Sequence, residues 1–170
     1  IRLNLIGFLF YNSFNCSFKK FSFRGDLNAK KIKTHFMRKQ IQADLSNIAD
    51  VLRKETLNYK ELSESINEFQ EIVSGIHSFR KDGEIESLHF DNGMALGTSY
   101  AAMCLKDCMR TKMFVKGIIE AIDTLASKSM GAIHILYAGT GPYATLLLPV
   151  LAKYSSERVK CSLLEVNAST

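Results

Sequence analysis

A glycine turn between two short apolar segments is the part of this sequence best suited to chemistry. Gly139-Thr140-Gly141-Pro142 follows the apolar run 133–137, and Glu165 lies near the end of a second run, 159–166. Glycine has no Cβ, so a glycine-rich backbone can approach a ligand closely, and an acid after the next strand can accept hydrogen bonds from ribose hydroxyls. This order predicts a site for a nucleoside-containing cofactor. The alternative is that the glycines only shape a turn and that Glu165 is a solvated strand end.

The segments around the turn must form a strand, a helix and a second strand to position it. Residues 133–137 and 159–166 are short and apolar, and the segment 144–154 between them is apolar with the length of a helix. Pro149 lies inside that expected helix, where it should cause a kink. Strands joined by a helix are parallel, so we expect the two strands to be parallel and buried. The helix N-terminus should follow the turn directly and offer its N–H groups to the ligand.

The sequence before the turn has the spacing of helices. Apolar residues recur every three or four positions over 38–79, which predicts two amphipathic helices, and again over 95–125, with Gly97 and Gly117 as soft breaks. A polar loop is expected at 80–86. We therefore predict an α/β fold, with a helical region over 37–130 and the first βαβ unit of a Rossmann-like domain over 131–170. Because two parallel strands leave open edges, we expect the chain to be truncated, the N-terminal part of a longer protein.

The positive charge of the chain is concentrated in its first residues. The formal net charge is +5 over 170 residues, but residues 1–40 carry +8 and the remainder carries −3. Residues 1–36 also hold seven of the eleven Phe and begin without Met. This leader could be a signal peptide, a segment that binds anionic lipid or single-stranded nucleic acid, or sequence translated from upstream of a start at Met37. The acidic remainder argues against nucleic acid as a partner for the body of the protein.

The cysteines and histidines do not form a metal-binding pattern. Cys104 and Cys108 lie four residues apart on an expected helix and could face one metal ion, but no Cys-x-x-Cys or His pair completes a set of four ligands. Four cysteines in 170 residues do not indicate a disulfide framework either, which favours a reducing, cytoplasmic setting. No apolar run approaches the ~20 residues that a membrane helix needs, so we expect no membrane span.

Pro142 helps to choose between two classes of cofactor. The run Gly-x-Gly-x-x-Ala over 139–144 also fits the fingerprint of dinucleotide-binding domains, which makes a nucleotide (NAD)-dependent oxidoreductase the second hypothesis. A pyrophosphate needs a turn lined with N–H donors, and proline removes one of them. The long helical region before the turn is also unusual for a dinucleotide domain. A third hypothesis is a helical interaction module that binds no ligand.

The segment Ile135–Pro142 resembles the first motif of class I S-adenosylmethionine-dependent methyltransferases. The resemblance implies that Tyr137, Ala138 and the turn 139–142 surround the methionine part of S-adenosylmethionine, and that Glu165 holds its ribose. Upstream, Leu105–Phe114 is similar to the Leu-x-Asp-x-x-Arg-Thr-x-x-Tyr segment of protein arginine methyltransferases. That likeness implies that Arg110 binds the cofactor's carboxylate, as a guanidinium can do with two hydrogen bonds. The alternative for Arg110 is a surface pair with Asp107.

The resemblance covers about residues 105–167 and leaves two questions open. The family usually has an acid two residues before the first glycine, where this chain has Tyr137, so the usual contact to the cofactor's amine is not supplied. The paired-glutamate loop that receives arginine substrates is not found in the 170 residues. The sequence therefore predicts S-adenosylmethionine as cofactor, and it identifies neither the methyl acceptor, a small molecule or a protein side chain, nor a catalytic residue.

Overall fold

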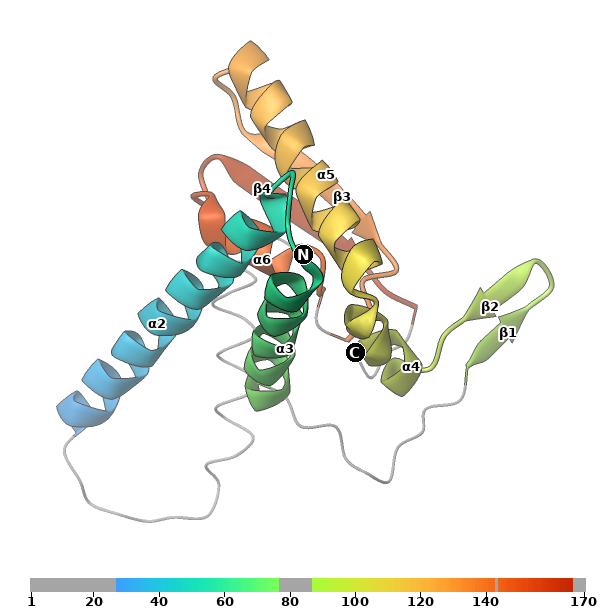
Figure 1. Ribbon diagram of the computed structural model, residues 1–170, viewed down its shortest axis with the longest axis horizontal. Coiled ribbons are helices and arrows are strands. Elements are labelled where there is room, and N and C mark those ends of the chain that lie inside the picture. The colour runs from blue at the N-terminus through green and yellow to red at the C-terminus, as the bar shows by residue number, and fades with distance from the viewer. Residues whose placement is uncertain (1–26, 77–86, 143, 167–170) are drawn as a thin grey trace.

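Two long helices open the described part of the chain, which comprises residues 27–76, 87–142 and 144–166 of the computed structural model (Figure 1). Helix α2 spans Leu27–Arg53 and α3 spans Tyr59–Ile76. Each buries one apolar stripe at helical spacing, which confirms the two predicted amphipathic helices; the buried residues are Leu45, Ile48, Ala49 and Leu52 on α2 and Leu62, Ile66, Phe69 and Val73 on α3. Asn58 begins α3, because its side-chain oxygen accepts the Glu61 N–H at 2.8 Å.

Helix α2 runs without interruption across Met37, so the expected leader boundary at residue 36 falls inside a helix. The leader residues 1–26 and the expected loop 80–86 lie outside the described residues.

A short β-hairpin follows, and the sequence analysis did not anticipate it. Strands β1 (Leu88–Phe90) and β2 (Gly93–Ala95) are antiparallel, with His89 opposite Met94. Asp91 and Asn92 form the two-residue connection, which is a common length and composition for a hairpin. The hairpin projects away from the helices (Figure 1).

The segment expected to be one helical stretch over 95–125 is divided into three pieces. Helix α4 spans Thr98–Met103, a 3₁₀ turn η1 spans Cys104–Lys106, and α5 spans Cys108–Lys128. The break lies at Asp107, whose side chain caps α5 by accepting the Arg110 N–H at 3.1 Å. Gly117 lies within continuous α5, so the break expected there was wrong. Cys104 and Cys108 lie on opposite sides of Asp107, so they do not share a helix as expected.

The carboxyl-terminal part contains the predicted strand, helix and second strand, with a much shorter helix. Strand β3 (Ile133–Ala138) pairs in parallel with β4 (Val159–Leu164), in a register that places Ile133 opposite Val159, which confirms the parallel pairing. Helix α6 spans only Leu148–Lys153, and Pro149 lies in its first turn. The expected kink was therefore wrong, because a proline in the first turn removes no intrahelical hydrogen bond.

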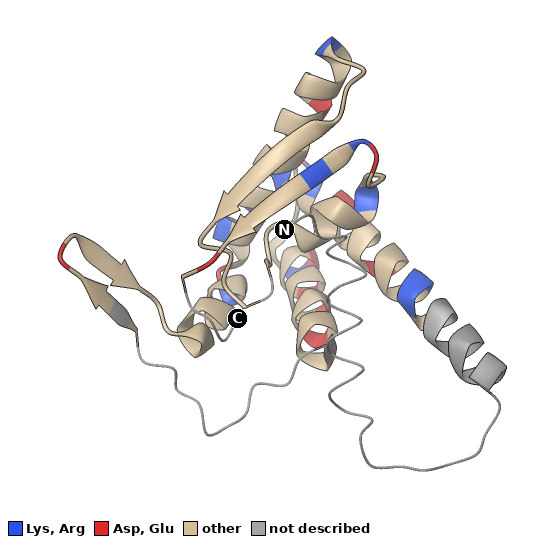
Figure 2. Ribbon diagram, turned by 180° about the vertical axis from the view of Figure 1, so that it is seen from behind, with Lys and Arg blue, Asp and Glu red and all other residues tan. Residues whose placement is uncertain are grey.

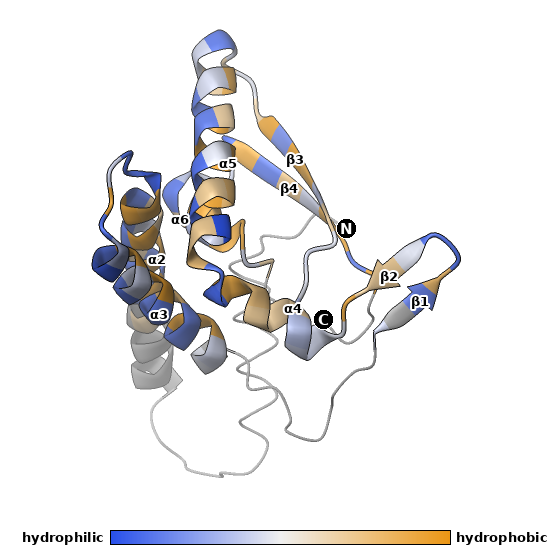
Figure 3. Cartoon of the chain, turned by 45° about the vertical axis from the view of Figure 1, so that its right-hand side comes forward, coloured by the Kyte–Doolittle hydropathy of each residue, from blue (hydrophilic) through white to orange (hydrophobic). Residues whose placement is uncertain are grey.

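Only one face of the β3–β4 sheet is packed, so the expectation of buried strands was wrong. Along each strand the side chains alternate between the helical core and solvent, and Leu136 and Leu164 remain 67% and 56% exposed. The two strands lie in front of the helices in Figure 2, and no element of the described residues covers them from that side. The core lies on the other face, where α2, α5 and α6 pack together. Hydrophobic residues along α2, α3, α5 and β3 supply it (Figure 3).

Polar contacts join the helices at the rim of this core. The Asp123 carboxylate on α5 accepts a hydrogen bond from the Tyr154 hydroxyl at 2.7 Å and pairs with Arg53 of α2 at 2.6 Å. Lys112 of α5 is buried, and its Nζ donates to the Lys54 carbonyl at the end of α2, 2.6 Å away. A helix end leaves its last carbonyls without intrahelical partners, so Lys112 supplies one of the missing donors. None of the described helices is both long and apolar enough to cross a lipid bilayer.

Candidate ligand pocket

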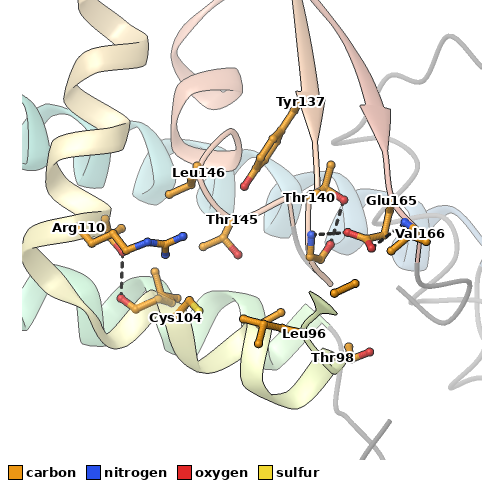
Figure 4. A pocket seen from close by; sticks show the side chains of 16 residues that line it. Leu96, Thr98, Cys104, Arg110, Tyr137, Thr140, Thr145, Leu146, Glu165 and Val166 are labelled. Atoms are coloured by element: carbon orange, nitrogen blue, oxygen red, sulfur yellow. Dashed lines mark hydrogen bonds between the residues drawn. The ribbon is translucent and has the colours of Figure 1, made fainter. Parts of the chain in front are cut away.

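A pocket of about 230 Å³ lies where the carboxyl ends of β3 and β4 meet the junction of α4, η1 and α5 (Figure 4). The glycine turn lines one side of the pocket, and the helices line the side opposite. The lining residues are Ala95, Leu96, Thr98, Ala101, Cys104, Leu105, Arg110, Thr111, Tyr137, Gly139, Thr140, Gly141, Thr145, Leu146, Glu165 and Val166. The carboxyl ends of parallel strands are the usual place for ligands in α/β folds.

The glycine turn has the left-handed backbone that its composition predicts. Gly139 has φ +70° and Gly141 has φ +63°, conformations that side chains other than glycine rarely adopt. Ala144, with φ +47°, is a third left-handed residue and carries a Cβ. Helix α6 begins only at Leu148, so the expectation of a helix N-terminus directly after the turn was wrong. The ligand-facing part of the turn is irregular backbone.

The backbone N–H groups of this turn are largely engaged inside the chain. Gly139 donates to the Leu164 carbonyl at 2.8 Å, and Gly141 donates to Glu165 Oε2, also at 2.8 Å. Pro142 has no N–H at all. A turn that cradles a pyrophosphate must direct such donors at the ligand, and this one directs two of them toward β4.

Glu165 follows the last residue of β4, as the sequence analysis expected, and its carboxylate turns back over the glycine turn (Figure 4). Its Oε2 accepts the Gly141 N–H and its Oε1 accepts the Val166 N–H, each at 2.8 Å. A carboxylate oxygen can accept more than one hydrogen bond. Glu165 therefore presents an anionic acceptor at the pocket edge whose orientation is held by the backbone.

Arg110 enters the pocket from the first turn of α5, on the wall opposite Glu165 (Figure 4). Its guanidinium carbon lies 5.4 Å from the centre of the Phe114 ring, one helical turn further on. The alternative of a surface ion pair with Asp107 is not found among the described residues; the Asp107 carboxylate instead accepts the Arg110 backbone N–H. The N-terminal end of a helix adds a partial positive charge, so this wall of the pocket favours an anion.

Tyr137 lies between these two charged residues, with its hydroxyl directed into the pocket (Figure 4). Burial raises the pKa of the Tyr137 hydroxyl, while a hydrogen bond from the Leu146 backbone and the charge of Arg110 lower it by less; the Glu165 carboxylate raises it slightly. The raised pKa means that Tyr137 stays neutral at physiological pH. It can donate or accept a hydrogen bond there, and it does not supply a negative charge.

The pocket unites most of the residues that the sequence singled out. Arg110, Tyr137, Gly139, Thr140, Gly141 and Glu165 all line it. Ala138 and Pro142 do not. Ala138 is exposed on the opposite face of β3, because successive side chains of a strand point to opposite sides. Pro142 lies beyond the second glycine, where the turn leaves the pocket.

Two stretches of lining were missed by sequence reasoning. Leu96, Thr98 and Cys104 come from the α4 region, and Thr145 and Leu146 follow the glycine turn. The buried Thr98, which is only 1% exposed, carries no motif, and its role depends on where α4 docks. The irregular path of 144–147 was obscured by its apolar composition, which resembles that of a helix.

Comparisons with models of protein families, with curated proteins and with solved structures gave no match to this chain. Among the described residues, no group of three or more His, Cys, Asp and Glu side chains is arranged to hold a metal ion.

Proposed function

We propose that the chain binds S-adenosylmethionine in this pocket, as the cofactor-binding part of a class I methyltransferase with a Rossmann-like domain. The observation that carries the proposal is the position of Glu165. It follows the second of two parallel strands, lies against the glycine turn after the first, and faces Arg110 across one pocket. A ligand with a hydroxyl pair at one end and a carboxylate at the other matches this arrangement.

Each part of the cofactor has a partner of suitable chemistry. The Glu165 carboxylate is a strong acceptor for the two ribose hydroxyls. Arg110 offers planar, paired donors for the carboxylate of the methionine part. Leu96, Leu146 and Val166 give the pocket apolar surface for the base and the thioether carbons. The sulfonium of this cofactor is already activated, so the role of such a domain is to hold the methyl group in line with an acceptor.

The same geometry disfavours the dinucleotide alternative. The N–H groups of Gly139 and Gly141 bond within the chain, Pro142 has none, and no helix begins directly after the turn. A pyrophosphate would therefore meet few donors at the place where a dinucleotide fingerprint concentrates them. We therefore expect the pocket not to bind NAD.

The proposal is tested by adding S-adenosylhomocysteine or NAD, up to millimolar concentration, to the ¹⁵N-labelled 170-residue chain. We expect S-adenosylhomocysteine to shift the amide signals of Thr140, Gly141 and Val166, and NAD to leave them in place. The Glu165→Gln variant should bind about tenfold more weakly, because it loses charge-assisted hydrogen bonds. Glu157→Gln is the matched control, since Glu157 is exposed near the opposite end of β4. Shifts with NAD alone, or no shifts with S-adenosylhomocysteine, would overturn the proposal.

A further inference from the structure

Among the described residues that line the pocket, one cation and one anion lie on opposite walls. Of the sixteen lining residues within 27–76, 87–142 and 144–166, only Arg110 and Glu165 are charged, and the remaining polar side chains are the neutral hydroxyls of Thr and Tyr and one thiol. Glu165 is held against the glycine turn by the Gly141 and Val166 amides. The carboxylate is thereby fixed at the β4 end of the pocket, away from Arg110 (Figure 4).

Uncharged side chains line the pocket on the strand side of Arg110, among them Tyr137, Thr145 and Leu146 (Figure 4). The side chain of Tyr137 packs against the hydrophobic core, and its hydroxyl is directed into the pocket (Figure 4). Among the described lining residues, a ligand group bound at the Arg110 end therefore meets a guanidinium and uncharged side chains. An amino acid end would bring both a carboxylate and an ammonium to this place. The carboxylate can pair with Arg110, whereas no described lining side chain at this end offers the ammonium an anion, and the guanidinium repels it.

We infer that this pocket recognises the carboxylate of the cofactor's amino acid end and does not recognise its ammonium. The inference rests on the proposed function and adds to it the ligand chemistry that the Arg110 end selects. A nucleoside thioether that ends in a simple carboxylate is the best match for that end. An ammonium that must give up water without gaining an anion weakens binding.

The test compares two ligands on the ¹⁵N-labelled chain. One is S-adenosylhomocysteine, and the other is its deaminated analogue, in which hydrogen replaces the α-ammonium. We expect the deaminated analogue to bind about three- to tenfold more tightly, as follows from removing one like-charge interaction near Arg110. Weaker binding of the deaminated analogue, with S-adenosylhomocysteine still bound, would overturn this inference and leave the proposed function standing. Failure of both ligands to bind would overturn the proposed function itself.

A variant that adds an anion to the pocket tests the same inference in a second way. Tyr137→Asp adds a carboxylate on the pocket face of β3, and we expect it to reverse the preference so that S-adenosylhomocysteine binds more tightly than the deaminated analogue. Tyr137→Phe is the matched control, because it removes the hydroxyl without adding charge and should keep the wild-type order. An unchanged order in Tyr137→Asp, with the variant shown to be folded by its amide spectrum, would overturn the inference. If Tyr137→Asp does not fold, the comparison of the two ligands on the wild-type chain and on Tyr137→Phe decides it.

Discussion

The carboxylate of Glu165 and the backbone amide of Gly141 are joined by a 2.8 Å hydrogen bond that ties the end of β4 to the turn after β3. A second hydrogen bond of the same length, from the Gly139 N–H to the Leu164 carbonyl, joins the same turn to the last residue of β4. Together they hold the turn over the strand ends, so the shape of the pocket depends on backbone conformations that glycine permits.

Replacing the turn glycines by alanine should destabilise the chain. At Gly139 and Gly141 the obstacle is the positive φ, because an added Cβ would meet no atom within 4 Å at Gly139 and only Ala101 Cβ at 3.6 Å at Gly141. We expect a loss of about 1–2 kcal/mol in the free energy of unfolding for each substitution. Urea denaturation followed by circular dichroism measures it.

Gly117→Ala is the control for these two variants. Gly117 lies inside α5, has no neighbouring atom within 4 Å of an added Cβ, and should gain about 0.5–1 kcal/mol from the better helix former. We therefore expect alanine to lower the free energy of unfolding at Gly139 and Gly141 and to raise it at Gly117. A gain in stability at Gly139 would show that its left-handed conformation is not required.

Arg158 joins the end of α5 to the start of β4, and its removal should be costly. Its guanidinium donates to the carbonyls of Ala126 at 2.9 Å and Ser129 at 2.5 Å, and also to that of Gly131. These carbonyls lie at and just beyond the end of a helix, where partners are scarce and positive charge is favoured. We expect Arg158→Ala to lower the free energy of unfolding by about 1.5–3 kcal/mol.

Arg158→Lys should recover only part of that loss, because an ammonium cannot reach three carbonyls with the planar geometry of a guanidinium. Lys160→Ala, at an exposed position of β4 two residues further on, should change stability by less than about 0.5 kcal/mol. Equal effects of Arg158→Ala and Lys160→Ala in thermal or urea unfolding would contradict the role of Arg158 as a cap.

The alkaline limit of stability should depend on Tyr154. Burial, together with the hydrogen bond to Asp123 and its negative charge, raises the pKa of the Tyr154 hydroxyl well above its ordinary value of 10. The unfolded chain therefore releases this proton first as the pH rises. Stability is fully present below pH 10 and falls as the pH rises above it. Tyr154→Phe should flatten this decline of the free energy of unfolding between about pH 10 and 11.

Periodicity and turn chemistry predicted much of the fold, and packing accounts for what they missed. The stripes of α2 and α3, the parallel β3–β4 pair and the acid after β4 follow from local patterns, which depend on residue types alone. The hairpin of β1 and β2 was missed because strands of three residues give almost no periodic signal. The exposed face of β3 and β4 was missed because an apolar run does not reveal whether one face or both are covered.

The sequence predicted those parts of the candidate site that depend on local position along one strand or turn, and it missed those that depend on how separate elements pack. Glu165 and the glycine turn meet because parallel strands end at the same edge of a sheet. Arg110 was found through a likeness in sequence, and no local pattern predicted that Asp107 would begin a helix there and aim the guanidinium at the turn. The contribution of Thr98 and Cys104 required knowing how α4 docks, which is a tertiary property.

Pro149 offers a test of where α6 begins. A proline in the middle of a helix costs about 3 kcal/mol, so its replacement there by alanine would stabilise the chain. The structure places Pro149 in the first turn and buries it. We therefore expect Pro149→Ala to destabilise the chain by about 0.4–1 kcal/mol through the greater freedom of the unfolded state, with a further loss from the smaller buried side chain. A gain in the free energy of unfolding would place the helix start before residue 148.

The Arg110 guanidinium should contribute to ligand binding through the carboxylate of the ligand and not through the fold. It packs over Phe114 near the helix surface, where such a contact is worth about 0.5–1 kcal/mol, so its removal should leave the structure largely intact. Arg110→Ala should weaken binding of S-adenosylhomocysteine by about tenfold or more, and Arg110→Lys by less, because lysine keeps the charge and loses the planar pair of donors. Lys106→Ala, which removes an exposed cation on η1, should leave binding unchanged.

A decarboxylated ligand tests the same role of Arg110. Decarboxylated S-adenosylhomocysteine should bind the wild-type chain poorly and lose little more affinity in Arg110→Ala. Equal losses for the intact and the decarboxylated ligand, measured by NMR titration, would show instead that Arg110 acts by shaping the first turn of α5.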